Sequence, residues 1–176
     1  VNFLISLQHY KIISKSSPVP IIIYNVPSRT ASNISAETTL KLANENSNII
    51  GIKEASGDFD QIMKIIKNKP NEFLVISGDD GLTIPMIYMG ANGVISVLAQ
   101  SLPKDFSEMV NQALIGEIKK ANKIHYKLYS YYNAIYSEGN PVGIKAHLEY
   151  LGLCNSFVRL PLVQASEKIK LMFKSI

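Results

Sequence analysis

Cysteine is nearly absent from this chain, since Cys154 is the only one among its 176 residues. A single cysteine excludes an internal disulfide and favours a reducing, cytoplasmic setting. Arginine is also scarce, and the net charge of +4 arises mainly from lysines that are scattered among acidic residues. No aromatic and basic motif accompanies these lysines. The charge therefore indicates a solvated surface, and we expect no nucleic-acid partner.

Long apolar runs are missing as well. No run approaches the roughly 20 residues that a helix needs to span a bilayer, so we expect no membrane partner. The apolar beginning of the chain, residues 1–7, lacks a basic leader and a small-residue cleavage site. This segment therefore does not have the pattern of a signal peptide.

Metal ligands and cysteine nucleophiles have little support in the sequence. Asp79 and Asp80 are adjacent carboxylates without histidine support, a pattern that is more typical of turns and helix caps. Cys154 is interpreted as a small apolar packing residue. The alternative is a cysteine nucleophile paired with His125 or His147, but nothing around Cys154 would activate its thiol. We expect no metal and no cofactor.

Short apolar segments alternate with amphipathic ones in the first part of the chain. These segments are apolar throughout, which is typical of parallel strands that are covered on both faces. Beyond Pro103 the pattern is helical, with breaks at Gly116 and at residues 138–141. The sequence therefore predicts an α/β part followed by helices. The expected strands are 21–24, 49–53, 73–77 and 93–97, and the expected helices are 4–14, one capped by Ser35, one from about Asp58, a short one around Met86, one from Pro103, and 117–136, 142–151 and 163–174.

An amine stands at the end of one of these apolar strands. Lys53 follows residues 49–52, and a lysine in a buried strand needs a chemical reason, because burial lowers the pKa of its ammonium group. A neutral amine can form a Schiff base with a ketone. Tyr24 ends the preceding strand, and the carboxyl ends of parallel strands meet at one edge of a sheet. The simpler alternative is a lysine that reaches from the strand end to solvent.

Four motifs occur in order along the chain: YNVPSRT from Tyr24, GIKEASG from Gly51, SGDDG from Ser77 and GVISV from Gly93. Together they resemble the dihydrodipicolinate synthase family, whose members are (β/α)8 TIM barrels with helices appended at the C-terminus. The resemblance implies that this chain matches strands five to eight plus those helices. It also implies a partial barrel over residues 1–115 and a helical region over residues 116–176.

The resemblance implies a lyase that condenses pyruvate with aspartate 4-semialdehyde in lysine and diaminopimelate biosynthesis. Lys53 would form the Schiff base with pyruvate, and Tyr24 would relay protons. Arg29 would hold the carboxylate of the semialdehyde, Gly78 would let the backbone approach the substrate, and Ile95 would line the pyruvate pocket. Without the resemblance, Arg29 would be assigned to a surface ion pair. The family also implies a homo-oligomer, in many members a homotetramer.

Alternatives remain open at this point. N-acetylneuraminate lyase and the 2-keto-3-deoxy-sugar acid aldolases share the lysine and the tyrosine, although the SRT context of Arg29 favours the synthase. The family's pyruvate-binding threonines and a further relay tyrosine belong to strands outside this chain. A non-catalytic half-barrel is therefore the competing interpretation. Four strands would also leave two sheet edges open, which favours self-association.

Overall fold

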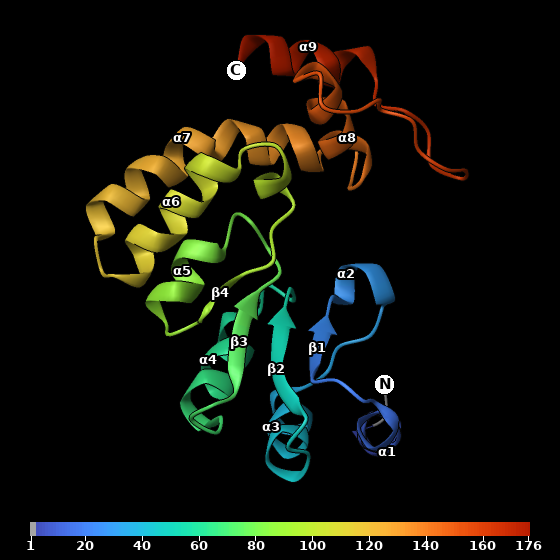
Figure 1. Ribbon diagram of the computed structural model, residues 1–176, viewed down its shortest axis with the longest axis vertical. Helices are drawn as coiled ribbons and strands as arrows, with labels where there is room; N and C mark the ends of the chain where they lie inside the picture. The colour runs from blue at the N-terminus through green and yellow to red at the C-terminus, as the bar shows by residue number, and fades with distance from the viewer. Residues whose placement is uncertain (1–2) are drawn as a thin grey trace. The chain divides into compact units, whose positions relative to one another are not determined.

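The computed structural model in Figure 1 describes residues 3–176. Residues 1 and 2, which begin the predicted region 1–115 and the apolar N-terminal segment, lie outside the described residues. The described residues form two compact units that divide between Ile95 and Ser96. No helix among residues 3–176 is long and apolar enough to cross a membrane.

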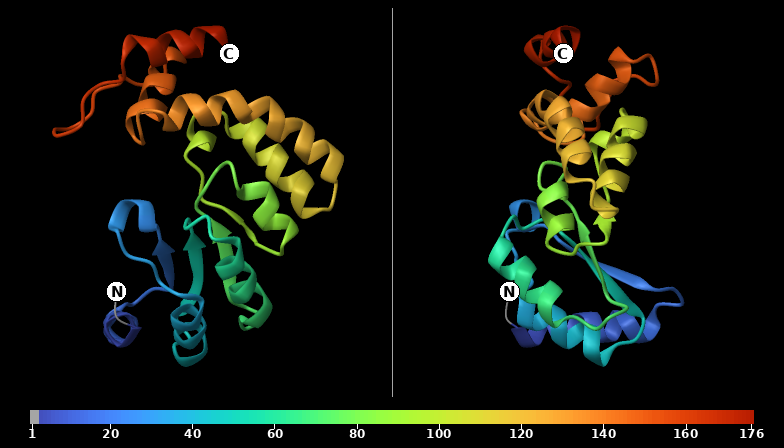
Figure 2. Two further views of the ribbon diagram at one scale, coloured as in Figure 1. Left: turned by 180° about the vertical axis from the view of Figure 1, so that it is seen from behind. Right: turned by 90° about the vertical axis from the view of Figure 1, so that its left-hand side faces the viewer.

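The first unit alternates strands and helices, as the sequence predicts. Its strands form one parallel sheet with the order β1-β2-β3-β4, so the α/β prediction is confirmed. Helices α1, α3 and α4 lie beside this sheet (Figure 2), and their buried apolar side chains share one core with it. The elements are α1 Phe3–Ser16, β1 Ile21–Asn25, α2 Pro27–Thr30, α3 Ala36–Glu45, β2 Ile49–Glu54, α4 Phe59–Asn68, β3 Leu74–Ser77, α5 Thr83–Tyr88 and β4 Gly93–Val94.

Side-chain caps begin the two central helices where the sequence predicts them. The Ser35 hydroxyl accepts a hydrogen bond from Thr38 N at the start of α3, at 3.2 Å. The Asp58 carboxylate accepts one from Gln61 N at the start of α4, at 3.0 Å. Each cap satisfies a backbone donor that has no partner inside its helix. The caps therefore fix where α3 and α4 leave the loops that follow β1 and β2.

Only one face of the sheet is covered, which corrects the prediction of two covered faces. Ile23, Ile52 and Val75 are buried and pack in the core with α3 and α4. On the opposite face, Ile22 is 38% exposed and Tyr24 is 47% exposed. Successive side chains of a strand point to opposite faces, and an uninterrupted apolar run does not reveal that one face lacks a cover. The open face is the one that carries Tyr24 and Lys53.

Strand β4 is shorter than the predicted strand 93–97, because it ends at Val94. Ile95 N still donates to Ser77 O of β3, at 3.0 Å. The chain then turns, and the Ser96 hydroxyl accepts a hydrogen bond from Ala99 N, at 2.9 Å. That bond begins a turn of 3-10 helix, which removes the last residues of the predicted strand from the sheet.

The second unit is helical. Pro103 occupies the first turn of α6, and Gly116 adopts a φ of 82° between α6 and α7. The predicted helix start at Pro103 and the predicted break at Gly116 are therefore confirmed. Helix α9 begins at Glu167, four residues later than predicted, because Ser166 N is held by the distant Glu138 carboxylate at 2.9 Å. The elements are η1 Leu98–Gln100, α6 Pro103–Leu114, α7 Ile118–Tyr136, α8 Val142–Tyr150 and α9 Glu167–Ser175.

Cys154 is exposed in the segment after α8, so its interpretation as a packing residue is wrong. The residues around it, 151–155, are all exposed, and the chain forms no core there. His147 is instead buried, and its Nδ1 lies 2.9 Å from the Ser101 hydroxyl. The Cys–His arrangement considered from the sequence has no hydrogen bond to support it among the described residues.

Candidate active site

Tyr24 and Lys53 lie side by side at the carboxyl ends of β1 and β2. The two residues are register partners, so their side chains leave the sheet on the same face. Lys53 Nζ lies 4.1 Å from the centroid of the Tyr24 ring, a cation–π contact. The structure thus brings together the two predicted catalytic residues. An amine and a phenol in contact are suited to carbonyl addition with nearby proton exchange.

Lys53 is half-buried rather than buried, which corrects the expectation drawn from its apolar strand. Its amine stands on the open face of the sheet, above the exposed Tyr24 ring. On one side, its alkyl chain lies close to Gly78, the residue that follows β3. Apolar neighbours in sequence are therefore a poor guide to the burial of a residue that faces the uncovered side.

Gly78 is placed against Lys53 by the end of β3. A Cβ atom at position 78 would lie 2.8 Å from Ala55 Cβ and 3.1 Å from Lys53 Cε. Both distances are shorter than ordinary van der Waals contacts, so a side chain there would displace the lysine. Glycine is required here for a close approach to Lys53.

The strand ends are joined by one repeated backbone hydrogen bond. Ala55 N donates to Asn25 O at 2.9 Å, Gly78 N to Glu54 O at 2.8 Å, and Ile95 N to Ser77 O at 3.0 Å. Each bond extends the parallel ladder by one step beyond the strand that donates it. Gly78 and Ile95 are thereby held at the same edge as Tyr24 and Lys53, and the Ile95 side chain is exposed.

Arg29 lies apart from this group, in the short helix α2 that follows β1. Its side chain is exposed, and its backbone N donates to Val26 O at 2.9 Å. Within residues 3–176 no carboxylate pairs with its guanidinium group, so the surface ion pair considered from the sequence is not formed. An unpaired guanidinium near the sheet edge is available to a carboxylate from outside the chain.

A buried carboxylate on the covered face was not assigned from the sequence. Glu54 follows Lys53, is 0% exposed, and accepts hydrogen bonds from the side chains of Asn25 and Gln61 and from Ser56 N. The signal was present, because residues 53 and 54 end a strand and must point to opposite faces. The donors could not be foreseen, since they come from β1, α4 and the loop after β2.

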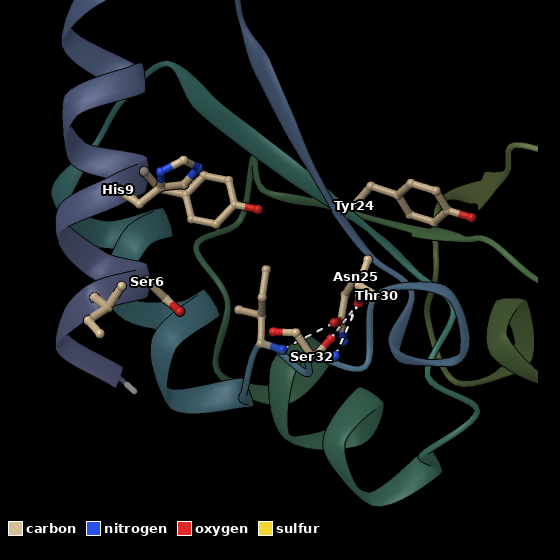
Figure 3. Close-up of a pocket in the computed structure, with 9 residues that line it drawn as sticks. Ser6, His9, Tyr24, Asn25, Thr30 and Ser32 are labelled. Carbon is tan, nitrogen blue, oxygen red and sulfur yellow. Dashed lines mark hydrogen bonds between the residues drawn. The ribbon is translucent and has the colours of Figure 1, made fainter. Parts of the chain in front are cut away.

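A pocket of about 250 Å³ lies between α1, β1 and the segment 30–34 (Figure 3). Ser6 and His9 of α1 line one side, and Asn25 and Thr30 line the other. Tyr24 also lines it, although Figure 3 shows its phenol pointing away from His9. The pocket therefore borders the outer edge of β1, which has no strand neighbour on that side among residues 3–176.

Of the two adjacent acids singled out in the sequence, Asp79 stabilises a turn. Asp79 Oδ1 accepts hydrogen bonds from Gly81 N and Leu82 N, at 2.9 and 3.1 Å. This is the turn role that the sequence favours for Asp79. Among the part of the chain that the structure describes, no three His, Cys, Asp or Glu side chains gather as metal ligands.

Residues 5–176 match the model of the dihydrodipicolinate synthetase family. A 4-hydroxy-tetrahydrodipicolinate synthase of Flavobacterium psychrophilum is 51% identical over 162 residues, which cover 92% of this chain and 55% of that protein. The dihydrodipicolinate synthase of Aquifex aeolicus superposes with a TM-score of 0.93 at 39% identity, covering 96% of this chain and 58% of that one. The enzyme of Acinetobacter baumannii, solved in complex with pyruvate, gives a TM-score of 0.94 at 34% identity, with 99% and 60% covered. This chain therefore spans little more than half the length of the relatives it matches.

Proposed function

Because this chain belongs to the dihydrodipicolinate synthetase family, we propose that it supplies the reacting amine and phenol of a 4-hydroxy-tetrahydrodipicolinate synthase. The substrates would be pyruvate and L-aspartate 4-semialdehyde, and the product would enter lysine and diaminopimelate biosynthesis. The observation that carries the proposal is the contact of the Lys53 amine with the Tyr24 ring, at 4.1 Å from the ring centroid.

The reaction begins when the Lys53 amine adds to the C2 carbonyl of pyruvate and forms a carbinolamine. Loss of water gives an iminium ion, and loss of a methyl proton gives an enamine. The enamine carbon then bonds to the aldehyde carbon of the second substrate, whose oxygen takes a proton. Attack of the substrate's own amine on the imine carbon closes the ring and releases the lysine amine.

Tyr24 is assigned to the proton transfers, because its phenol is the acid or base group in contact with the lysine. Arg29 is assigned to the carboxylate of the semialdehyde, as an exposed guanidinium beyond β1. Gly78, which has no side chain, lets the backbone lie close to Lys53, and Ile95 lines the pyruvate subsite directly after β4.

The wider assignments belong to the same proposal. We take the strands of this chain as strands five to eight of a (β/α)8 barrel, with residues 1–115 as barrel and residues 116–176 as appended helices. The working enzyme would be a homo-oligomer, a homotetramer in its simplest form. A cytoplasmic setting suits a chain with one cysteine.

Borohydride trapping tests the reacting residue. The chain is joined behind the N-terminal part of the Flavobacterium psychrophilum synthase that it does not cover, and the fusion is treated with pyruvate and borohydride. We expect a stable pyruvyl adduct on Lys53 by peptide mass spectrometry. Lys53→Ala should abolish the adduct, whereas Lys64→Ala, at an exposed lysine of α4 paired with Asp60, should retain it. An adduct on another lysine would overturn the assignment.

Arg29 decides between this synthase and the other pyruvate aldolases. In the same fusion, Arg29→Ala should raise the KM for aspartate 4-semialdehyde and leave that for pyruvate nearly unchanged. Loss of a charge-assisted pair corresponds to about 2 kcal/mol, roughly a thirtyfold fall in kcat/KM. Equal changes for both substrates would remove the reason to prefer the semialdehyde.

A further inference from the structure

Glu54 is a buried carboxylate whose partners are all uncharged. Its Oε1 lies 2.8 Å from Ser56 N and 3.0 Å from Asn25 Nδ2. Its Oε2 lies 3.0 Å from Gln61 Nε2 and 3.1 Å from Asn25 Nδ2. Burying a carboxylate is unfavourable unless donors surround it. Both oxygens of Glu54 accept hydrogen bonds here, Oε1 from Ser56 N and Oε2 from Gln61 Nε2.

The donors come from separate segments of the first unit. Asn25 ends β1, Ser56 follows β2, and Gln61 lies in the first turn of α4. Asn25 is itself 1% exposed, and its Oδ1 accepts a hydrogen bond from Ile34 N at 3.1 Å. Asn33 joins the group by donating to Gln61 Oε1, at 2.9 Å. Glu54 is therefore the acceptor at the centre of this network.

The network lies directly beneath the reacting pair. Asn25 and Glu54 are register partners, as are Tyr24 and Lys53, so the two pairs occupy consecutive rows of the sheet. Their side chains point to opposite faces. A bond that fixes Asn25 to Glu54 on the covered face also fixes the backbone from which Tyr24 and Lys53 project on the open face.

We propose that Glu54 is a positioning residue, whose carboxylate holds the ends of β1 and β2 so that the Lys53 amine stays against the Tyr24 ring. Its importance for catalysis rests on the proposed function, but the positioning itself does not. The role requires the acceptor pattern of a carboxylate. An amide at position 54 would have nearly the same shape, yet its NH2 group would face other donors and break the network.

The contact can be measured without any substrate. The chain is reductively methylated with ¹³C-formaldehyde, which keeps the positive charge of each lysine, and the methyl resonances are recorded by NMR. The Lys53 signal is assigned by its loss in Lys53→Arg. The face of the Tyr24 ring should shift it upfield, and Tyr24→Leu should remove that shift.

Glu54→Gln should reduce the upfield shift to less than half. The double variant Glu54→Gln/Gln61→Glu should restore it, because the new amide NH2 then donates to a carboxylate at position 61 while its oxygen keeps Ser56 N. The control is Ile62→Val, which removes a methylene from a fully buried neighbour in α4 and weakens the fold by the core alone. It should leave the Lys53 resonance in place.

The inference is overturned if Glu54→Gln keeps the shift, or if the double variant folds without restoring it. Circular dichroism verifies folding, and where Glu54→Gln does not fold, Gln61→Met decides, since it removes one donor and should give an intermediate shift. Borohydride trapping in the fusion protein supplies the second readout, with a fall of roughly tenfold or more in the Glu54→Gln adduct rate. An unmodified wild-type Lys53 after trapping, with the NMR changes as expected, would refute the proposed function and leave the positioning role standing.

Discussion

Lys53 and Glu54 are neighbours in sequence, yet their side chains leave β2 on opposite faces of the sheet. The lysine contacts Tyr24 on the open face, and the glutamate accepts hydrogen bonds on the covered one. The proposed reacting residue and the proposed positioning residue are thus consecutive in the sequence. A substitution that shifts the backbone at one of these positions therefore also moves the side chain at the other.

Gly78→Ala is expected to weaken carbonyl chemistry at Lys53. The added methyl group would lie 2.8 Å from Ala55 Cβ and 3.1 Å from Lys53 Cε, so the lysine must move. The overpacking should destabilise the fold by about 1 to 3 kcal/mol and slow adduct formation by more than tenfold. Urea unfolding and borohydride trapping measure the two effects.

Gly81→Ala is the matched control in the same loop. A Cβ there meets only Asp79 Oδ1, at 3.4 Å, and has room. Its adduct rate should equal that of the wild type. Equal losses in both variants would mean that loop flexibility, rather than the approach to Lys53, makes glycine necessary.

At this scale the sequence was a good guide to which residues meet and a poor guide to what supports them. Tyr24 and Lys53 could be paired because both end apolar strands that are neighbours in a parallel sheet. Glu54 could not be assigned, because its donors Asn25 and Gln61 are 29 and 7 residues away. Nothing in the pattern of apolar residues states which polar side chains converge on a buried acid.

Helix α8 carries a buried histidine that should make the helical unit sensitive to acid. Burial lowers the pKa of His147 and of His125 in α7. These two imidazoles therefore bind protons less readily in the folded chain than in the unfolded chain. Their contribution to stability is complete above the unfolded pKa of about 6.5 and is lost as the pH falls toward the lower folded pKa.

The expected result is a lower urea midpoint at pH 5.5 than at pH 7.5. Each histidine changes the free energy of unfolding by at most about 1.4 kcal/mol per pH unit. His147→Gln should flatten this pH dependence, while His9→Gln, at an exposed position on α1, should leave it unchanged. An unaltered slope in His147→Gln would assign the acid sensitivity to other groups.

Element boundaries were predictable where the signal is local. Ser35 and Asp58 cap the helices that they immediately precede, so their roles can be seen in a few residues of sequence. The start of α9 could not be predicted, because Ser166 is held by Glu138, 28 residues away. The early end of β4 could not be predicted either, because the apolar run continues through the turn that Ser96 begins.

The first unit, taken whole, presents an uncovered sheet face and two edge strands, β1 and β4. Unpaired strand edges and exposed apolar side chains both favour association. We expect the isolated chain to self-associate in sedimentation velocity and to show negligible synthase turnover. Ile22→Lys, on the open face, should reduce the association.

Ile115→Lys provides the comparison, because it introduces the same charge at an exposed isoleucine of the helical unit. The sedimentation profile of this variant should match that of the wild type. A monodisperse wild-type monomer with normal turnover would contradict both expectations. The sequence motifs indicated a barrel family. Which side chains of each strand lie on the open face became clear only from the register of the strands in the sheet.

The two-sided strands have a consequence for protein engineering. Residues on the covered face, such as Ile23, Ile52 and Val75, maintain the fold. On the open face of the same strands lie Ile22, Tyr24 and Ile76. The second set can be redesigned without repacking the first. A designer can therefore treat the open face as a replaceable surface on a fixed scaffold and install new reactive groups around the amine of Lys53.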